Sequence, residues 1–179
     1  MDIENESKTG VLKNTISFGI SRTKLYVARF LTQLIVLVAA IVLVSGSLLL
    51  GNLVFNGGCS HEALMTFVRS IAYTTILWIA SLSFAHALAM CLNSNSLGTV
   101  IYILYFLIVN SVIEMVHMAM PSNAIVTFMS KYELYEFGSR TIVRNEVANN
   151  LANYFWVGGV YLLVTFGLGI FFFRRKEVK

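Results

Sequence analysis

The sequence predicts an all-α integral membrane protein with about four transmembrane helices, forming a single transmembrane domain over residues 1–179. Hydrophobic residues make up 57% of the chain and charged residues only 12%, whereas about 25% of the residues in a soluble domain are charged. The apolar residues gather in long blocks, and a helix needs about 20 apolar residues to cross a bilayer. Because basic residues gather at the two chain ends beside these blocks, the net charge of +4 indicates membrane orientation and not nucleic-acid binding.

Four blocks are long enough to span. A polar break from Asn93 to Ser96 separates the second from the third, and Pro121, the only proline, ends the third. Backbone groups in hydrocarbon must bond to each other, so blocks of this length are expected to be helices. Strands of a membrane barrel would show about 10 residues of alternating polarity, a pattern absent here. The predicted spans are about residues 30–51, 67–92, 97–120 and 154–173.

The flanking basic residues predict the orientation. Five precede the first span and four follow the last, whereas the loop at 52–66 has no Lys or Arg. The positive-inside rule then predicts both termini in the cytoplasm. The outer loop at 121–153 opposes this assignment, because it contains three basic residues beside three glutamates.

The outer loop also shows helical periodicity. Ile125, Phe128, Met129, Tyr132 and Tyr135 form one apolar stripe, and a second stripe repeats every four residues. Two short amphipathic helices at the outer interface would give this pattern, and so would a packed extracellular cap. The second stripe consists of Val143, Val147 and Leu151.

Signatures of catalysis are absent from the sequence. There is no Walker loop for ATP, no Cys/His pair at metal-ligand spacing and no G-x-S-x-G elbow. We therefore expect no enzyme activity, no cofactor and no metal in this chain. Cys59 and Cys91 fall near opposite membrane faces, so no disulfide is expected.

The polar stretch before the first span is the most informative part of the sequence. Val11, Leu12, Ile16 and Ile20 mark one side of a short amphipathic cytoplasmic helix. Physical chemistry alone makes this stretch a basic interfacial anchor. Its residue order adds a resemblance: Glu6, Gly10 and Leu12 precede the run Gly19-Ile20-Ser21-Arg22, and Arg29 enters the span.

This order resembles the type 2 ABC-transporter permeases, particularly those for export of, or immunity to, bacteriocins and lantibiotics in Gram-positive bacteria. The resemblance implies that residues 1–29 form a cytoplasmic segment whose part from about 3 to 22 couples to a separate ATPase. It also implies that the chain matches the C-terminal portion of such a permease, since family members have two further spans before this motif. The implied coupling residues are Glu6, Gly10, Leu12, Gly19, Ser21 and Arg22.

The function implied by the resemblance is that of a membrane-spanning permease subunit of an ATP-driven exporter in the bacterial plasma membrane. Its substrate would be a peptide antibiotic or another hydrophobic molecule. Its partners would be an ABC ATP-binding subunit, a second permease copy or related permease subunit, and the lipid bilayer. The alternative is a non-transporting immunity or accessory protein that binds a bacteriocin or a partner directly.

One polar face lies inside the third span. Glu114 is the only acidic residue in a predicted span, and an intramembrane carboxylate is a functional candidate because its burial in a membrane is costly. Asn110, Glu114 and His117 share a helical face through their spacing. They are candidates for a substrate path, or else they form a polar cluster at the outer interface or within the bundle.

Small residues predict where helices approach closely. We expect these contacts within the chain more than between two copies, and we expect His86, among them, to be a packing residue. The predicted small surfaces are Ser47 and Gly51, then Ser81, Ala85 and Ala89, and finally Gly158, Gly159, Gly167 and Gly169.

Overall fold

The computed structural model describes residues 18–134 and 151–175, and every secondary-structure element in that part is helical. Four helical runs are long and apolar enough to cross a membrane: α3, α4, the continuous run α5–η1–α6, and α9. The predicted all-α class and four candidate spans are thereby confirmed. The elements are α3 (Arg22–Asn56), α4 (His61–Leu92), α5 (Asn95–Leu104), the π-helical turn η1 (Tyr105–Val109), α6 (Asn110–Ala119), α7 (Ala124–Tyr132) and α9 (Leu151–Arg175).

The helix ends follow local capping chemistry. The Ser21 hydroxyl accepts a hydrogen bond from the Lys24 amide at 3.3 Å and so begins α3 before the predicted span. At the predicted polar break, Asn93 adopts a left-handed conformation with φ 56° and ends α4. Ser94 then caps α5 by accepting from the Leu97 amide at 3.3 Å. The chain therefore reverses direction within a few residues.

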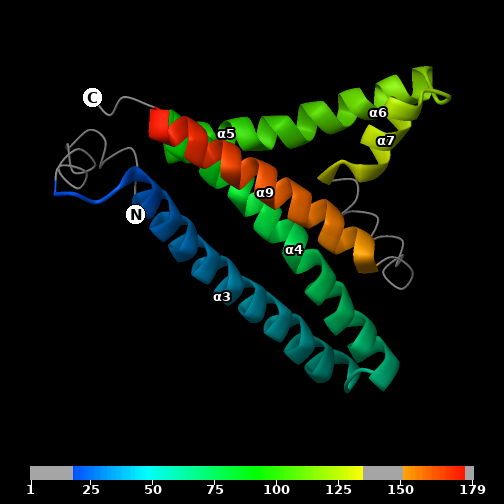
Figure 1. Ribbon diagram of the computed structural model, residues 1–179. Helices are drawn as coiled ribbons and strands as arrows, with labels where there is room; N and C mark the ends of the chain where they lie inside the picture. Colours follow the sequence, from blue (N-terminus) through cyan, green and yellow to red (C-terminus); the bar gives the residue numbers. More distant parts are fainter. Residues whose placement is uncertain (1–17, 135–150, 176–179) are drawn as a thin grey trace.

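The helices form an open bundle (Figure 1). Helices α4 and α9 lie side by side and run in the same direction, and α3 runs opposite to them. The run α5–η1–α6 leaves α4 at its start and diverges, and α7 folds back from its far end toward α9. The start of α3 and the end of α9 lie at the same end of the bundle, where Arg22 Nη1 donates to the Arg174 carbonyl oxygen at 3.1 Å.

Glycines mark three close approaches. A Cβ atom at Gly98 would lie 2.8 Å from the Ala89 Cα, and one at Gly158 would lie 2.9 Å from the Ile76 Cγ1. A Cβ atom at Gly169 would lie 2.8 Å from the Ala87 Cβ. These distances leave no room for a side chain, so α5 packs directly on the α4 backbone at Ala89, and α9 packs closely on the α4 side chains of Ile76 and Ala87.

The predicted small-residue contacts are therefore confirmed at Ala89, Gly158 and Gly169. As contacts within the chain they are wrong for Gly51, Gly159 and Gly167, since a Cβ built at these positions would meet no described atom beyond its own stretch of helix within 4 Å. Adjacent residues of a helix point in different directions, so Gly158 can face α4 while Gly159 faces away.

Two apolar clusters hold α4 and α9 together. One lies near the start of α3 and contains Tyr26, Ala89, Met90 and Phe173. The other lies toward the opposite end and contains Leu77, Ala80, Leu134, Tyr154 and Val157. Between them, the Thr165 hydroxyl donates to the Ser83 hydroxyl at 2.9 Å and joins the two helices.

Candidate functional site

The first candidate region is the place where the start of α3 packs against α4 and α9. Tyr26 is completely buried, and its ring centroid lies 4.5 Å from that of His86 and 5.3 Å from that of Phe166. Both pairs have the edge-to-face geometry that aromatic rings prefer. We call this region the terminal junction; it consists of Tyr26, Arg29, Phe30, His86, Met90, Phe166 and Phe173.

Polar contacts fix α3 to α4 within the terminal junction. His86 is 1% exposed, and its Nε2 lies 3.2 Å from the Tyr26 carbonyl oxygen. A carbonyl oxygen can only accept, so Nε2 holds the proton and donates it. Arg29 is also buried, with Nη1 3.8 Å from the Met90 sulfur. His86 is thus a packing residue, as expected.

Three of the predicted coupling residues lie beside this junction. Gly19 has φ +88°, a left-handed conformation that suits glycine, and forms the turn before α3. Ser21 caps α3, and Arg22 contacts the end of α9. The other predicted coupling residues, Glu6, Gly10 and Leu12, lie outside the described residues. A coupling role for this set stays a prediction.

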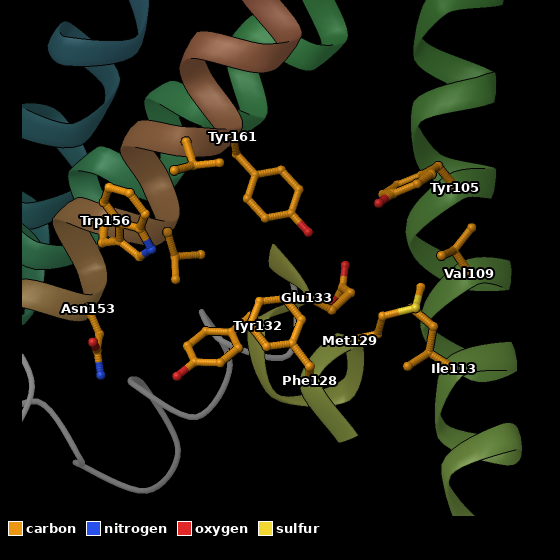
Figure 2. Close-up of a pocket in the computed structure, with 12 residues that line it drawn as sticks. Tyr105, Val109, Ile113, Phe128, Met129, Tyr132, Glu133, Asn153, Trp156 and Tyr161 are labelled. Atoms are coloured by element: carbon orange, nitrogen blue, oxygen red, sulfur yellow. The ribbon is translucent and has the colours of Figure 1, made fainter. Parts of the chain in front are cut away.

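The second candidate region is a cavity of about 440 Å³ between α7, α9 and the run from η1 into α6 (Figure 2). Its walls are mostly apolar and aromatic. We call it the α7 pocket; it is lined by Tyr105, Val109, Ile113, Phe128, Met129, Tyr132, Glu133, Asn153, Trp156, Val157, Val160 and Tyr161.

A carboxylate and two phenol groups converge in the α7 pocket. Glu133, the residue that ends α7, is only 3% exposed. Figure 2 shows its carboxylate and the hydroxyls of Tyr105 and Tyr161 pointing into the same space from three different elements. The pocket thus has apolar walls and a small polar centre, which is the usual composition of a ligand site.

The π-helical turn contributes one wall of the α7 pocket. Tyr105 and Val109 are the first and last residues of η1, and Ile113 follows on α6. All three line the cavity. Such wide turns are rare and occur frequently at functional sites. Here the π-helical turn lies in the wall of the pocket opposite α7.

The predicted substrate-path residues lie on α6 but outside this pocket. Glu114 is exposed, and Asn110 and His117 are half-buried. None of the three lines the α7 pocket, so their role in a substrate path stays a prediction. The pocket instead uses a neighbouring face of the same helical run.

The apolar stripe predicted before the last span does contribute to the pocket. Phe128, Met129 and Tyr132 lie on α7 and line the cavity, whereas Ile125 is 71% exposed. Tyr135, Val143 and Val147 lie outside the described residues, as does the side chain of Leu151. Sequence reasoning missed Tyr105, Glu133 and Tyr161, because only tertiary packing brings these three together.

Comparison with protein-family models, with curated proteins and with solved structures finds no match for this chain. Within residues 18–134 and 151–175, no three His, Cys, Asp or Glu side chains lie close enough to hold a metal ion. The candidate regions among the described residues are the terminal junction and the α7 pocket.

Proposed function

We propose that the chain is a membrane-spanning permease subunit of an ATP-driven exporter in the bacterial plasma membrane, with both termini cytoplasmic. Its partners would be a separate ABC ATP-binding subunit and a second permease copy or related subunit. The observation that supports this most is the position of Gly19 to Arg22. This element, which resembles the permease coupling motif, leads directly into the terminal junction of three candidate spans.

The packing of α3 suggests how such coupling would work. Along α3 only Tyr26, Arg29 and Phe30 are buried. When ATP draws the partner ATPases together, a push on the preceding segment would reach α4 through His86 and α9 through Arg174. The helices would respond as rigid bodies, because their backbone hydrogen bonds are internal. Energy would come from the partner's nucleotide chemistry and not from this chain.

The outer part of α3 has a surface suited to a second permease subunit. Beyond Phe30 most of its apolar side chains are exposed, among them Val36 at 64% and Leu43 at 73%. Ser47 and Gly51 lie on this part of the helix, and an added Cβ at Gly51 would meet no described atom within 4 Å. Small residues allow close approach of a neighbouring helix in the membrane. A hydrophobic or peptide substrate would cross between two such subunits.

Substituting Arg22 tests the coupling role. We expect Arg22→Gln to reduce the amount of ATPase that co-purifies with the tagged, membrane-extracted chain by about fivefold, since a partly exposed charged hydrogen bond contributes about 1 kcal/mol. The matched control is Arg69→Gln, because Arg69 is an exposed arginine on α4, far from the α3 start. The measurement is quantitative mass spectrometry of the purified complex.

Deletion of residues 3–22 makes the test decisive. This variant is expected to lose the ATPase entirely while it remains in the membrane fraction. Full ATPase recovery after the deletion, or equal losses for Arg22→Gln and Arg69→Gln, would contradict the coupling role.

A second candidate function is direct binding of a bacteriocin or similar molecule without transport. The α7 pocket favours it, because a preformed cavity with an enclosed carboxylate needs no ATPase to bind a ligand. The same purification distinguishes the two functions. A chain that binds a ligand but recovers no ATPase from its native membrane would be the binding protein.

A further inference from the structure

A groove of about 620 Å³ lies between α4 and α9, in the half of the bundle where both helices end. The two helices lie side by side and run in the same direction (Figure 1). The groove shares no lining residue with the α7 pocket. We call it the α4–α9 groove; it is lined by Phe84, Ala87, Leu88 and Cys91 of α4 and by Thr165, Leu168, Gly169, Phe172 and Arg175 of α9.

The length of the α4–α9 groove matches the depth of one bilayer leaflet. Its lining residues recur at helical spacing, so the groove runs lengthwise along both helices. On α9 they extend from Thr165 to Arg175, a stretch about 15 Å long at 1.5 Å per residue. The hydrocarbon core of a bilayer is about 30 Å thick, so one leaflet contributes half of that depth.

Helix packing fixes the shape of the α4–α9 groove. At its floor, a Cβ atom on Gly169 would lie 2.8 Å from the Ala87 Cβ, so the two helices nearly touch there. In the wall, the Phe84 ring centroid lies 4.9 Å from that of Tyr105 in an edge-to-face contact. The Thr165 hydroxyl donates to the Ser83 hydroxyl within the bundle. The groove is therefore preformed and apolar along its length.

The end of the groove is basic. Arg175, near the end of α9, is the charged residue among its described lining residues. The guanidinium carbon of Arg175 lies 4.1 Å from the Phe171 ring centroid. A guanidinium stacked by its face keeps its N–H donors at the edge of its plane, where a phosphate can accept two hydrogen bonds.

The charges around Arg175 favour an anion. The described acidic residues are Glu62 at the start of α4, Glu114 on α6 and Glu133 after α7. None of them lies at the end of the bundle where α9 ends and α3 begins. The described basic residues in the first turn of α3 and the last turn of α9 are Arg22, Lys24, Arg174 and Arg175.

We propose that the α4–α9 groove binds a phospholipid with an anionic headgroup. One acyl chain lies along the groove, and the phosphate bonds to Arg175. A membrane lipid joins an apolar chain of leaflet length to a phosphate at the membrane surface, as the groove requires, and basic pockets between membrane helices bind such headgroups. The inference rests on the proposed orientation only for the choice of the cytoplasmic leaflet, and it does not depend on an ATPase.

Two lipids with identical acyl chains test the charge preference. The full chain is purified in detergent, freed of co-purified lipid and titrated with phosphatidylglycerol or with phosphatidylcholine. Native mass spectrometry measures the fraction of the chain that carries one lipid. We expect phosphatidylglycerol to bind about fivefold more tightly, the effect of one basic residue near a membrane surface. Equal binding of the two lipids would overturn the proposal.

Neighbouring arginines distinguish the groove from general surface charge. We expect Arg175→Gln to weaken phosphatidylglycerol binding by about fivefold. Arg174→Gln is the matched control, because Arg174 is the adjacent residue of α9 and does not line the groove. The contact of Arg22 uses the Arg174 carbonyl oxygen, which this substitution keeps. Equal losses for the two variants, or no loss for Arg175→Gln, would contradict a site in the groove.

Two tryptophan substitutions test the position of the acyl chain. Leu168 lines the groove and is 51% exposed, whereas Leu163 on the same helix lies outside it and is 75% exposed. We expect Leu168→Trp, which narrows the groove, to weaken phosphatidylglycerol binding by about fivefold or more, and Leu163→Trp to keep the parent's affinity. Equal affinities of the two variants would overturn the proposed position of the chain. The comparison of the two lipids on the unsubstituted chain does not depend on the folding of any variant.

Competition with glycerol 3-phosphate separates a lipid site from a site for a free anion. This molecule has the phosphate of the lipid without its acyl chains. We expect it to displace no phosphatidylglycerol at equal concentration. Displacement would show that the phosphate alone is bound and would overturn the lipid assignment.

Discussion

Replacing Tyr26 by alanine is expected to destabilise the bundle by about 3–5 kcal/mol, the usual cost of removing a fully buried aromatic ring. Tyr26 is 0% exposed and contacts His86, Phe166 and Phe173. Removal of its ring would leave a void in the only part of α3 that is buried. The measurement is the free energy of unfolding from an SDS titration in mixed micelles, followed by circular dichroism.

Two control variants make this result specific. The Tyr26 hydroxyl has no hydrogen-bond partner among the described residues, so Tyr26→Phe removes an unsatisfied polar group and is expected to be neutral or stabilising. Phe55 on the same helix is 86% exposed, and Phe55→Ala is expected to have little effect. A Tyr26→Phe variant as unstable as Tyr26→Ala would show that the hydroxyl, and not ring packing, holds α3 in place.

Replacing Gly169 by leucine is expected to separate the end of α9 from its neighbours. A Cβ atom there would collide with the Tyr26 hydroxyl and lie 2.8 Å from the Ala87 Cβ. Overpacking of this kind costs about 1–3 kcal/mol, and more where backbones cannot shift. The same titration and the elution volume in size-exclusion chromatography measure the effect.

Gly167 supplies the matched control, since a Cβ atom there would meet nothing within 4 Å. We expect Gly167→Leu to keep the parent's stability, and equal destabilisation by the two substitutions would contradict the packing of α9. The smaller change Gly169→Ala refines the test. In a Tyr26→Phe background its cost is expected to fall, because the nearest colliding atom is gone, and a double-mutant cycle measures this coupling.

The spans could be predicted because the bilayer imposes a strong rule. A long uncharged run can satisfy its backbone only as a helix, so composition and length identified the four candidate helices. The start of α3 was harder to predict, because Arg22, Lys24 and Arg29 lie before the point where the apolar run begins. Lysine and arginine are good helix formers, and the Ser21 cap begins the helix before them. Hydropathy therefore located the span but not the helix end.

The close helix crossings were only partly predictable. Gly158 and Gly159 are equally small, and periodicity alone cannot show which one faces α4. Gly98 belongs to no periodic stripe of small residues in the sequence, yet it lies very close to Ala89 of α4. Its importance depends on a residue of another helix, which sequence spacing does not show.

The α7 pocket was the least predictable feature. Sequence reasoning sought the site at Glu114, because a carboxylate within a span is costly, but the structure leaves Glu114 exposed on α6. The enclosed carboxylate is Glu133, which the sequence places in a charged loop. Tyr105 and Tyr161 lie far from it along the chain and meet it only through the fold-back of α7.

The proposed function depends most directly on which end of the bundle faces the cytoplasm. The ATPase can act on the chain only if the start of α3 lies on the cytoplasmic side. Cys59 is exposed in the turn between α3 and α4, and Arg174 is exposed at the end of α9. These positions lie at opposite ends of the bundle (Figure 1). Labelling of intact cells with a membrane-impermeant maleimide compares Cys91→Ala, which keeps Cys59, with a cysteine-free chain containing Arg174→Cys. We expect labelling of Cys59 in intact cells and labelling of the Arg174→Cys chain only after permeabilisation, and the reverse pattern would contradict the proposed coupling to a cytoplasmic ATPase.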